Sequence, residues 1–219
     1  MDLAIRCPER IRAVIPIGSG AKPSVLKKML NFEQIFAVEE DPHFNHGDYY
    51  DGPSPKKGLV LARMIAHKSF ISLGVIEKRT KEHIVQEESD LAGYRIQLQL
   101  ESYFLHQGKK FADRFDANTH VRTLGAMQTF NLAEKYGKGD LAAALLPCVG
   151  QHWLNFSIDS DVCFYPEEQM AITTALKEND IDYQHVTVHS DKGHDAFLLE
   201  PKLFTPHFQY LINKLLGQQ

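Results

Sequence analysis

Two kinds of hydrophobic pattern alternate along the chain. Residues 11–19 read IRAVIPIGS, a short apolar run rich in Val and Ile, and such a run is typical of a buried strand in a parallel sheet. Residues 153–158 and 183–189 predict two further strands. Because helical segments separate the three runs, the order favours an α/β fold with a parallel sheet and right-handed crossovers.

The remaining apolar positions recur at helical spacing. This spacing predicts helices over residues 1–7, 23–40, 59–67, 94–115, 116–130, 167–179 and 201–216. Residues 42–55 contain Gly47, Gly52, Pro53 and Pro55, so we expect an irregular loop there.

These elements suggest three regions. Residues 1–57 form a partial α/β core, residues 58–136 a helical insertion, and residues 137–219 a second part of the α/β core. Three strands are few beside the ~5–6 strands of an average sheet. This small number indicates that part of the sheet is missing from the pattern.

Composition narrows the function classes. The chain has 219 residues, a formal charge of −4 and 43% hydrophobic residues, which is ordinary globular usage. An acidic balance argues against nucleic-acid binding. No apolar run approaches the ~20 residues of a membrane span, and the N-terminus lacks a signal-peptide pattern. Three widely spaced cysteines fit a reducing cytoplasm, with neither a disulfide framework nor a zinc pattern.

Ionisable residues follow two of the predicted strands. Asp159-Ser160-Asp161 comes after the second, and a loop containing Gly193-His194-Asp195 comes after the third. An acid followed by a histidine is the chain order of the triad in α/β-hydrolases. Taken alone, the pattern still favours two solvated loop residues over a catalytic pair.

Longer stretches carry a more specific signal. The segments RAVIPIGSGA, GDYYDGPSPKKGLVLARMIAH, ESYFLHQGKKFADRFDAN, SIDSD and GHDAFLLE together resemble the homoserine O-acetyltransferase family, acyltransferases of the α/β-hydrolase fold. The resemblance runs through nearly the whole chain. It implies the C-terminal part of a doubly wound, mostly parallel sheet, with the helical insertion as a lid.

The resemblance also assigns roles to four residues. It implies that Asp161 is the triad acid, His194 the triad base, Asp195 the contact for the substrate amino group and Arg63 the contact for its carboxylate. A zwitterionic amino acid needs one fixed cation and one fixed anion for orientation. Without the resemblance, Arg63 reads as a solvated helix residue, and Asp195 also suits the N-cap of a helix beginning at Ala196.

Metal sites are disfavoured. His185, His189, Asp191 and His194 include common ligand types, but His185 and His189 lie four apart on a strand and therefore far from each other. His43, His46 and Asp48 lie in a loop with flexible spacing. We expect no metal and no bound cofactor.

The sequence also departs from the family. No serine stands in a Gly-x-Ser-x-Gly elbow, and Ser19 lies between Gly18 and Gly20 without that spacing. The nucleophile is therefore expected outside these residues, so the chain is expected to be incomplete and inactive alone. Val162 and Cys163 stand where the family has Trp and an aliphatic residue, and Gln128 stands where an Asp is common.

The resulting prediction is a cytoplasmic enzyme that moves an acyl group, acetyl in the first instance, from acyl-CoA to L-homoserine in methionine biosynthesis. The resemblance implies a homodimer through the lid helices, with no nucleic-acid or membrane partner. Succinyl-CoA as donor and serine as acceptor stay open. An esterase of the same fold and an inactive fragment or binding module that needs a separate N-terminal half are the alternatives.

Overall fold

The computed structural model describes residues 1–82, 91 and 93–217. It divides into two compact units. The sheet unit comprises Met1–Pro23 and Phe130–Gln219, and the helical unit comprises Ser24–Thr129. These divisions differ from the expected region boundaries at 57/58 and 136/137, because the helix predicted over residues 23–40 packs with the helices that follow it.

Three parallel strands form the described sheet, in the order β1 (Ala13–Val14), β2 (His152–Ile158) and β3 (Tyr183–Val188). The first strand is much shorter than the predicted run of residues 11–19. Pro16 has no N–H to donate to the ladder, so regular pairing ends at Val14. A single bridge between Ile17 and Phe156 keeps the segment beside β2.

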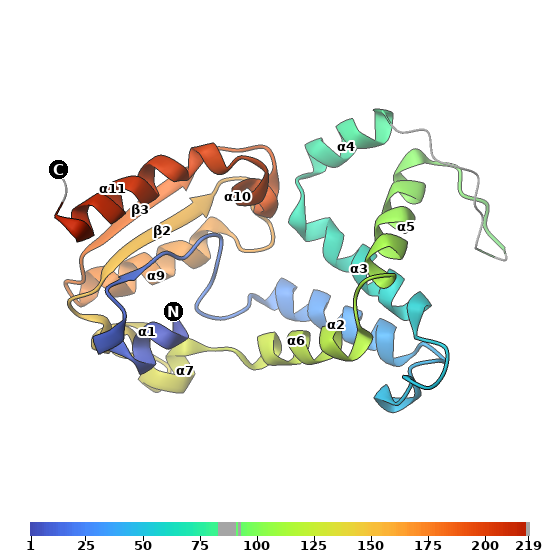
Figure 1. Cartoon of the computed structure of the whole chain (residues 1–219), viewed down its shortest axis with the longest axis horizontal. Helices are drawn as coiled ribbons and strands as arrows, with labels where there is room; N and C mark the ends of the chain where they lie inside the picture. Colours follow the sequence, from blue (N-terminus) through green and yellow to red (C-terminus); the bar gives the residue numbers. More distant parts are fainter. Residues whose placement is uncertain (83–90, 92, 218–219) are drawn as a thin grey trace. The chain divides into compact units, whose positions relative to one another are not determined.

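The central strand is buried on both faces. Leu154, Phe156 and Ile158 belong to one apolar cluster with residues of α11 (Thr205–Leu216). Trp153 points the other way, into a cluster that includes Ile172 and Leu176 of α9 (Pro166–Glu178). Alternate residues of a strand face opposite sides, and β2 accordingly runs between α9 and α11 (Figure 1). This places its carboxyl end, where the candidate loops begin, on a rigid support.

Short helices complete the sheet unit. They are α1 (Asp2–Arg6), η1 (Pro8–Arg10), α7 (Leu132–Gly137), α8 (Leu141–Leu145), η3 (Leu146–Cys148), η4 (Gly193–Asp195), α10 (Ala196–Leu199) and η5 (Pro201–Leu203). The predicted helices over residues 1–7, 167–179 and 201–216 are confirmed in kind, the last being divided into η5 and α11.

The helical unit contains α2 (Val25–Glu39), η2 (Asn45–Gly47), α3 (Lys56–Phe70), α4 (Leu73–Glu82), α5 (Gln99–Ala112) and α6 (Ala117–Thr129). Its core includes Val38, Leu59, Ala62 and Phe111. A Cβ at Gly58 would lie 2.4 Å from the Ala37 carbonyl oxygen, so glycine permits the close approach of α3 to α2. The helices predicted over 23–40, 59–67, 94–115 and 116–130 are confirmed, whereas α4 was not predicted.

Among the described residues, no single helix is long and apolar enough to cross a membrane. The pair Lys56–Phe70 and Leu73–Thr80 reaches that length and composition only when taken together, and it is bent by 117°. The cytoplasmic location stays a prediction.

Candidate active site

The structure brings Asp161 and His194 together. Asp161 follows the end of β2, and His194 lies in η4, after β3. His194 Nδ1 lies 2.8 Å from Asp161 Oδ2, and the two side chains are 19% and 0% exposed. An acid that bonds Nδ1 fixes the imidazole tautomer and leaves Nε2 as the atom that can exchange a proton with a reacting group. The pair therefore has the geometry of a catalytic acid and base.

Backbone amides hold the other carboxylate oxygen of Asp161. The N–H groups of Cys163 and Phe164 donate to Oδ1 at 2.7 and 2.9 Å. Hydrogen bonds to the ionised form compensate a buried carboxylate for its lost hydration. Cys163, one of the departures from the family, therefore contributes its backbone to the site, while the Val162 side chain is 41% exposed.

The two residues before Asp161 also bind the loop that carries His194. Asp159 accepts from Ser190 N at 3.1 Å and pairs with His189 Nδ1 at 2.8 Å. Ser160 Oγ donates to the Ser190 carbonyl at 2.5 Å and accepts from Gly193 N at 3.0 Å. Three consecutive side chains thus join the loops, a role that the sequence analysis did not assign to Asp159 or Ser160. The signal was the unbroken polar triplet after an apolar strand.

Electrostatics at Asp159 agree with this joining role. Burial raises the pKa of its carboxyl group, but the hydrogen bonds from His189 and Ser190 outweigh burial and hold the pKa below its ordinary value. Asp159 is thus a stable anion beside the second loop.

Asp195 occupies the N-cap position of α10, but its side chain makes no capping hydrogen bond. The capping explanation raised by the sequence therefore does not account for its carboxylate. It directly follows His194, so it lies beside the proton-transfer pair in the chain.

Arg63 lies in α3 of the helical unit. Its guanidinium carbon is 5.1 Å from the centre of the Phe70 ring and 5.0 Å from that of Phe111. Aromatic faces attract a cation and restrict its plane, so the side chain is not the ordinary solvated helix arginine. Arg63 thus packs against two aromatic rings of the helical unit.

Two buried histidines lie close enough to Arg63 for its charge to affect them. His67 is 4% exposed and His120 9% exposed. Burial, followed by the charge of Arg63, lowers the pKa of each to about 4, with Arg79 a further cause at His67. Both imidazoles are therefore neutral near pH 7, so neither adds a second positive charge beside Arg63.

Gln128, a further departure from the family, has a structural role. Its Nε2 donates to the Lys28 carbonyl at 3.0 Å, and its Oε1 accepts from Asn31 Nδ2 at 3.4 Å. Gln128 thus joins α6 to α2 within the helical unit.

The residues weighed for a metal site have other partners. His185 lies 2.5 Å from Ser157 Oγ and 2.9 Å from Thr173 Oγ1, and His189 pairs with Asp159. Across residues 1–82, 91 and 93–217, no three His, Cys, Asp or Glu side chains group in a way that could hold a metal ion.

Comparison with known proteins identifies the relatives of this chain. No family model matches it. It is 36% identical over 208 residues to a homoserine O-acetyltransferase of Mesorhizobium japonicum, a match that covers 93% of this chain and 52% of the relative. It is 33% identical over 216 residues to a homoserine O-succinyltransferase of Nitrosomonas europaea, covering 98% and 56%. The chain belongs to the homoserine O-acyltransferase family.

Comparison with solved structures shows the fold of this member of the homoserine O-acyltransferase family. The homoserine O-acetyltransferase of Bacillus anthracis superposes with a TM-score of 0.81 at 18% identity, over 92% of this chain and 53% of that one. Esterase E22 gives 0.79 at 17% identity, over 92% and 54%. The fold is that of the α/β-hydrolases, as expected, and the chain spans about half the length of the curated relatives it matches.

Proposed function

We propose that this chain provides the acid, the base and two substrate contacts of an enzyme that transfers an acyl group from acyl-CoA to the hydroxyl of L-homoserine. The observation that carries the proposal is the 2.8 Å contact between the fully buried Asp161 carboxylate and His194 Nδ1. The family to which the chain belongs supports the reaction class.

The proposed reaction has two half-reactions. His194 Nε2 takes the proton of a serine hydroxyl, the serine oxygen attacks the thioester carbonyl, and the thiol of coenzyme A leaves with a proton from His194. The homoserine hydroxyl then gives its proton to His194, attacks the acyl-serine ester and forms O-acylhomoserine, and the released serine oxygen takes the proton back from His194. Asp161 stabilises the imidazolium in both halves.

In this proposal the nucleophile lies outside the 219 residues. Ser19 lacks the elbow spacing, and its buried hydroxyl makes no hydrogen bond with any residue that the structure describes. It is therefore not bonded to His194. A serine supplied by another segment or by a second polypeptide would complete the triad.

The substrate contacts follow the chemistry of an amino acid. Arg63 would bind the carboxylate with its planar fork, and Asp195 would bind the ammonium group. An esterase that passes the acyl group to water has no use for such a pair, which favours acyl transfer. Both acetyl and succinyl donors occur among the named relatives, so the proposal covers either.

The assay of acyl transfer tests the proposal. Protein purified from its native source should form O-acylhomoserine from acetyl-CoA or succinyl-CoA, and His194→Ala in the native gene should lower the rate by several orders of magnitude. Near-normal turnover by that variant would contradict the triad. Intact mass of the native protein distinguishes the two sources of serine, since a mass above 24.9 kDa places it in the same polypeptide.

We also propose a homodimer through the helical unit. Helix α2 exposes apolar side chains at helical spacing, Val25, Met29, Phe32 and Phe36, each 55% to 77% exposed. On its other faces it buries Val38 together with the polar residues Lys27, Asn31 and Gln34. A row of exposed apolar side chains along one helix face is typical of a partner-binding surface.

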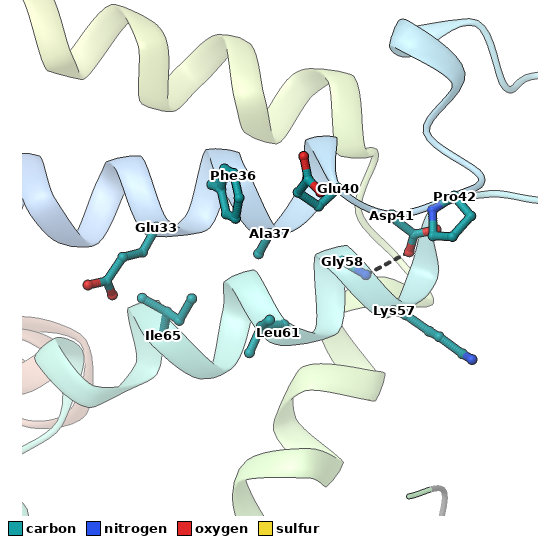
Figure 2. A pocket seen from close by; sticks show the side chains of 10 residues that line it. All are labelled: Glu33, Phe36, Ala37, Glu40, Asp41, Pro42, Lys57, Gly58, Leu61 and Ile65. Carbon is teal, nitrogen blue, oxygen red and sulfur yellow. Dashed lines mark hydrogen bonds between the residues drawn. The ribbon is translucent and has the colours of Figure 1, made fainter. Parts of the chain in front are cut away.

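The surface beside the exposed apolar residues of α2 carries charges of both signs. A groove of about 500 Å³ between α2 and α3 is lined by apolar side chains and by charged ones of both signs (Figure 2). The apolar ones include Phe36, Leu61 and Ile65, and the charged ones are Glu33, Glu40, Asp41 and Lys57. A patch with both signs of charge can complement its own copy across a two-fold axis. A second copy of the chain is therefore the proposed partner.

Sedimentation tests the dimer. Phe36→Asp should convert a dimer to a monomer, whereas Leu73→Asp, at an 80% exposed position of α4, should leave the dimer intact. A monomer in the unmodified protein, or equal effects of the two variants, would contradict the proposal.

A further inference from the structure

Gly18 lies directly against the Asp161–His194 pair. It follows β1 and has a positive φ of +47°. A Cβ built on it would lie 2.9 Å from Asp161 Oδ2, 3.2 Å from His194 Nδ1 and 3.4 Å from His194 Cε1. The first two atoms are the two ends of the hydrogen bond between the pair. A side chain at this position would therefore meet the hydrogen bond itself.

The backbone of Gly18 has little freedom to retreat. Its N–H donates to the Phe156 carbonyl of β2 at 3.1 Å, and its neighbour Ile17 pairs with the same residue. Because β2 is buried on both faces, this anchor is rigid. Any conflict at Gly18 must be resolved by the acid or the base.

Asp161 also cannot move away. Its side chain is fully buried, and its second oxygen accepts from two backbone amides. His194 is the more exposed partner at 19%. Its ring lies 5.6 Å from that of Phe164 and 5.8 Å, edge-on, from that of Phe197. A Cβ at residue 18 would therefore displace the imidazole from Asp161.

We propose that Gly18 is a positioning residue, whose missing side chain allows the Asp161–His194 hydrogen bond to form. The inference rests on the proposed function only in assigning catalytic roles to the pair. The arrangement does not require contact between Gly18 and any substrate, so the residue acts through His194 alone.

Gly217 is a matched control, because it separates backbone strain from contact. It also has a positive φ, +65°, and a Cβ there would meet nothing within 4 Å. Alanine in the left-handed region is strained at either position. Only alanine at residue 18 would meet the catalytic pair.

Proton NMR of the histidine-labelled protein expressed from its native gene tests the proposal without any turnover. The Nδ1 proton of His194, hydrogen-bonded to a buried carboxylate, should give a low-field, slowly exchanging resonance, assigned by its loss in Asp161→Asn. Gly18→Ala should abolish that resonance, and Gly217→Ala should retain it. An unchanged resonance in Gly18→Ala would overturn the proposal.

A thermodynamic cycle covers the case in which Gly18→Ala does not fold. Gly217→Ala should lower Tm by about 3 °C from backbone strain, and Gly18→Ala by at least twice as much. In an Asp161→Ala background, which removes the atom nearest to the new Cβ, Gly18→Ala should lower Tm no more than Gly217→Ala does. Equal losses in both backgrounds, including failure to fold in both, would overturn the proposal.

The NMR and Tm results test the role of Gly18 independently of whether the proposed acyl transfer occurs. If the native protein transfers no acyl group, the NMR and Tm differences still decide whether Gly18 positions the pair. If acyl transfer occurs and Gly18→Ala leaves the resonance intact, only this inference fails.

Discussion

The sheet unit and the helical unit hold their charged side chains in different ways. In the sheet unit, Asp161 is fully buried and directional hydrogen bonds reach both of its oxygens. In the helical unit, Arg63 lies against two aromatic rings, with neutral histidines close by. A carboxylate needs donors at defined angles, whereas a guanidinium is attracted by a ring face over a range of positions.

This difference suits the proposed tasks. The acid and base must keep one geometry through both half-reactions, and hydrogen bonds provide that precision. A substrate contact must orient its charge toward an incoming carboxylate, and aromatic faces restrict the plane of a cation. Breaking a hydrogen-bonded arrangement should therefore have larger effects than changing the aromatic one.

The largest effect is expected at Asp161. Asp161→Asn in the native gene keeps the shape but removes the charge and presents the wrong group to His194 Nδ1, so acyl transfer should fall about 10⁴-fold. The rate of O-acylhomoserine formation measures it. Asp159→Asn is the control, because it changes a neighbouring carboxylate that pairs with His189 rather than His194. A similar loss in both variants would mean that loop structure, rather than the pair, was disturbed.

A smaller effect is expected in the helical unit. Arg63→Ala should raise the homoserine KM by about 10–150-fold, the range of a hydrogen bond to a charged group, while thioester cleavage without homoserine stays near its normal rate. Steady-state kinetics with each substrate separate the two. Arg114→Ala removes another guanidinium, 5.7 Å from the centre of the same Phe111 ring, and should leave the KM unchanged. An unchanged KM for Arg63→Ala would reject its assigned role.

The buried histidines predict a pH dependence of stability. In the fold, the pKa of His67 and of His120 is about 4, below the ordinary 6.5. The unfolded chain therefore binds more protons between these pH values, so stability is full above pH 6.5 and falls as pH decreases toward 4. The expected slope is about 1.4 kcal/mol per pH unit for each histidine.

Urea unfolding across this pH window measures the slope. The double variant His67→Gln/His120→Gln should reduce the slope, whatever its absolute stability, and leave the contribution of His185, whose pKa burial also lowers. His106→Gln, at an exposed position of α5, should preserve the slope of the unmodified chain. An undiminished slope in the double variant would place the titrating groups elsewhere.

The smallest effect is expected at Ser160. Ser160→Ala removes two hydrogen bonds that join the loops, each worth about 1 kcal/mol, so kcat should fall roughly tenfold with little change in KM. Thr174→Ala removes a hydroxyl bonded to the Met170 carbonyl on an exposed helix face and should not change kcat. Equal values for both variants would show that the loops keep His194 in place without Ser160.

Part of the site could be predicted from local pattern. An apolar run predicts a buried strand, and polar residues directly after it lie at the carboxyl edge of a parallel sheet. This logic placed Asp161 and His194 at the ends of neighbouring strands, and the pairing of β2 with β3 brought them together. The contacts of Asp159, Ser160 and Gly18 were missed, because they depend on side chains and backbone more than a hundred residues apart or on neighbouring loops.

The length of β1 shows the same limit. Val and Ile enrichment predicted a strand over residues 11–19, but the ladder needs an N–H at every other residue and Pro16 lacks one. In α2, helical spacing predicted the helix correctly but not which face is buried. Its exposed Phe32 and Phe36 have the composition of a core face, and only packing within the helical unit decides their exposure.

The sequence by itself determined the α/β order and the family, because these depend on residue type and on patterns within short segments. The tertiary structure decided the geometry of the site. It sets the 2.8 Å contact of Asp161 with His194 and the backbone amides that bind the other Asp161 oxygen. It also sets the close approach of Gly18 to this pair and the packing of Arg63 against two aromatic rings. Each of these depends on distances between separate segments. Such distances are fixed only when the elements pack, since hydrogen bonds and close contacts act over a few ångströms and carry no local sequence pattern.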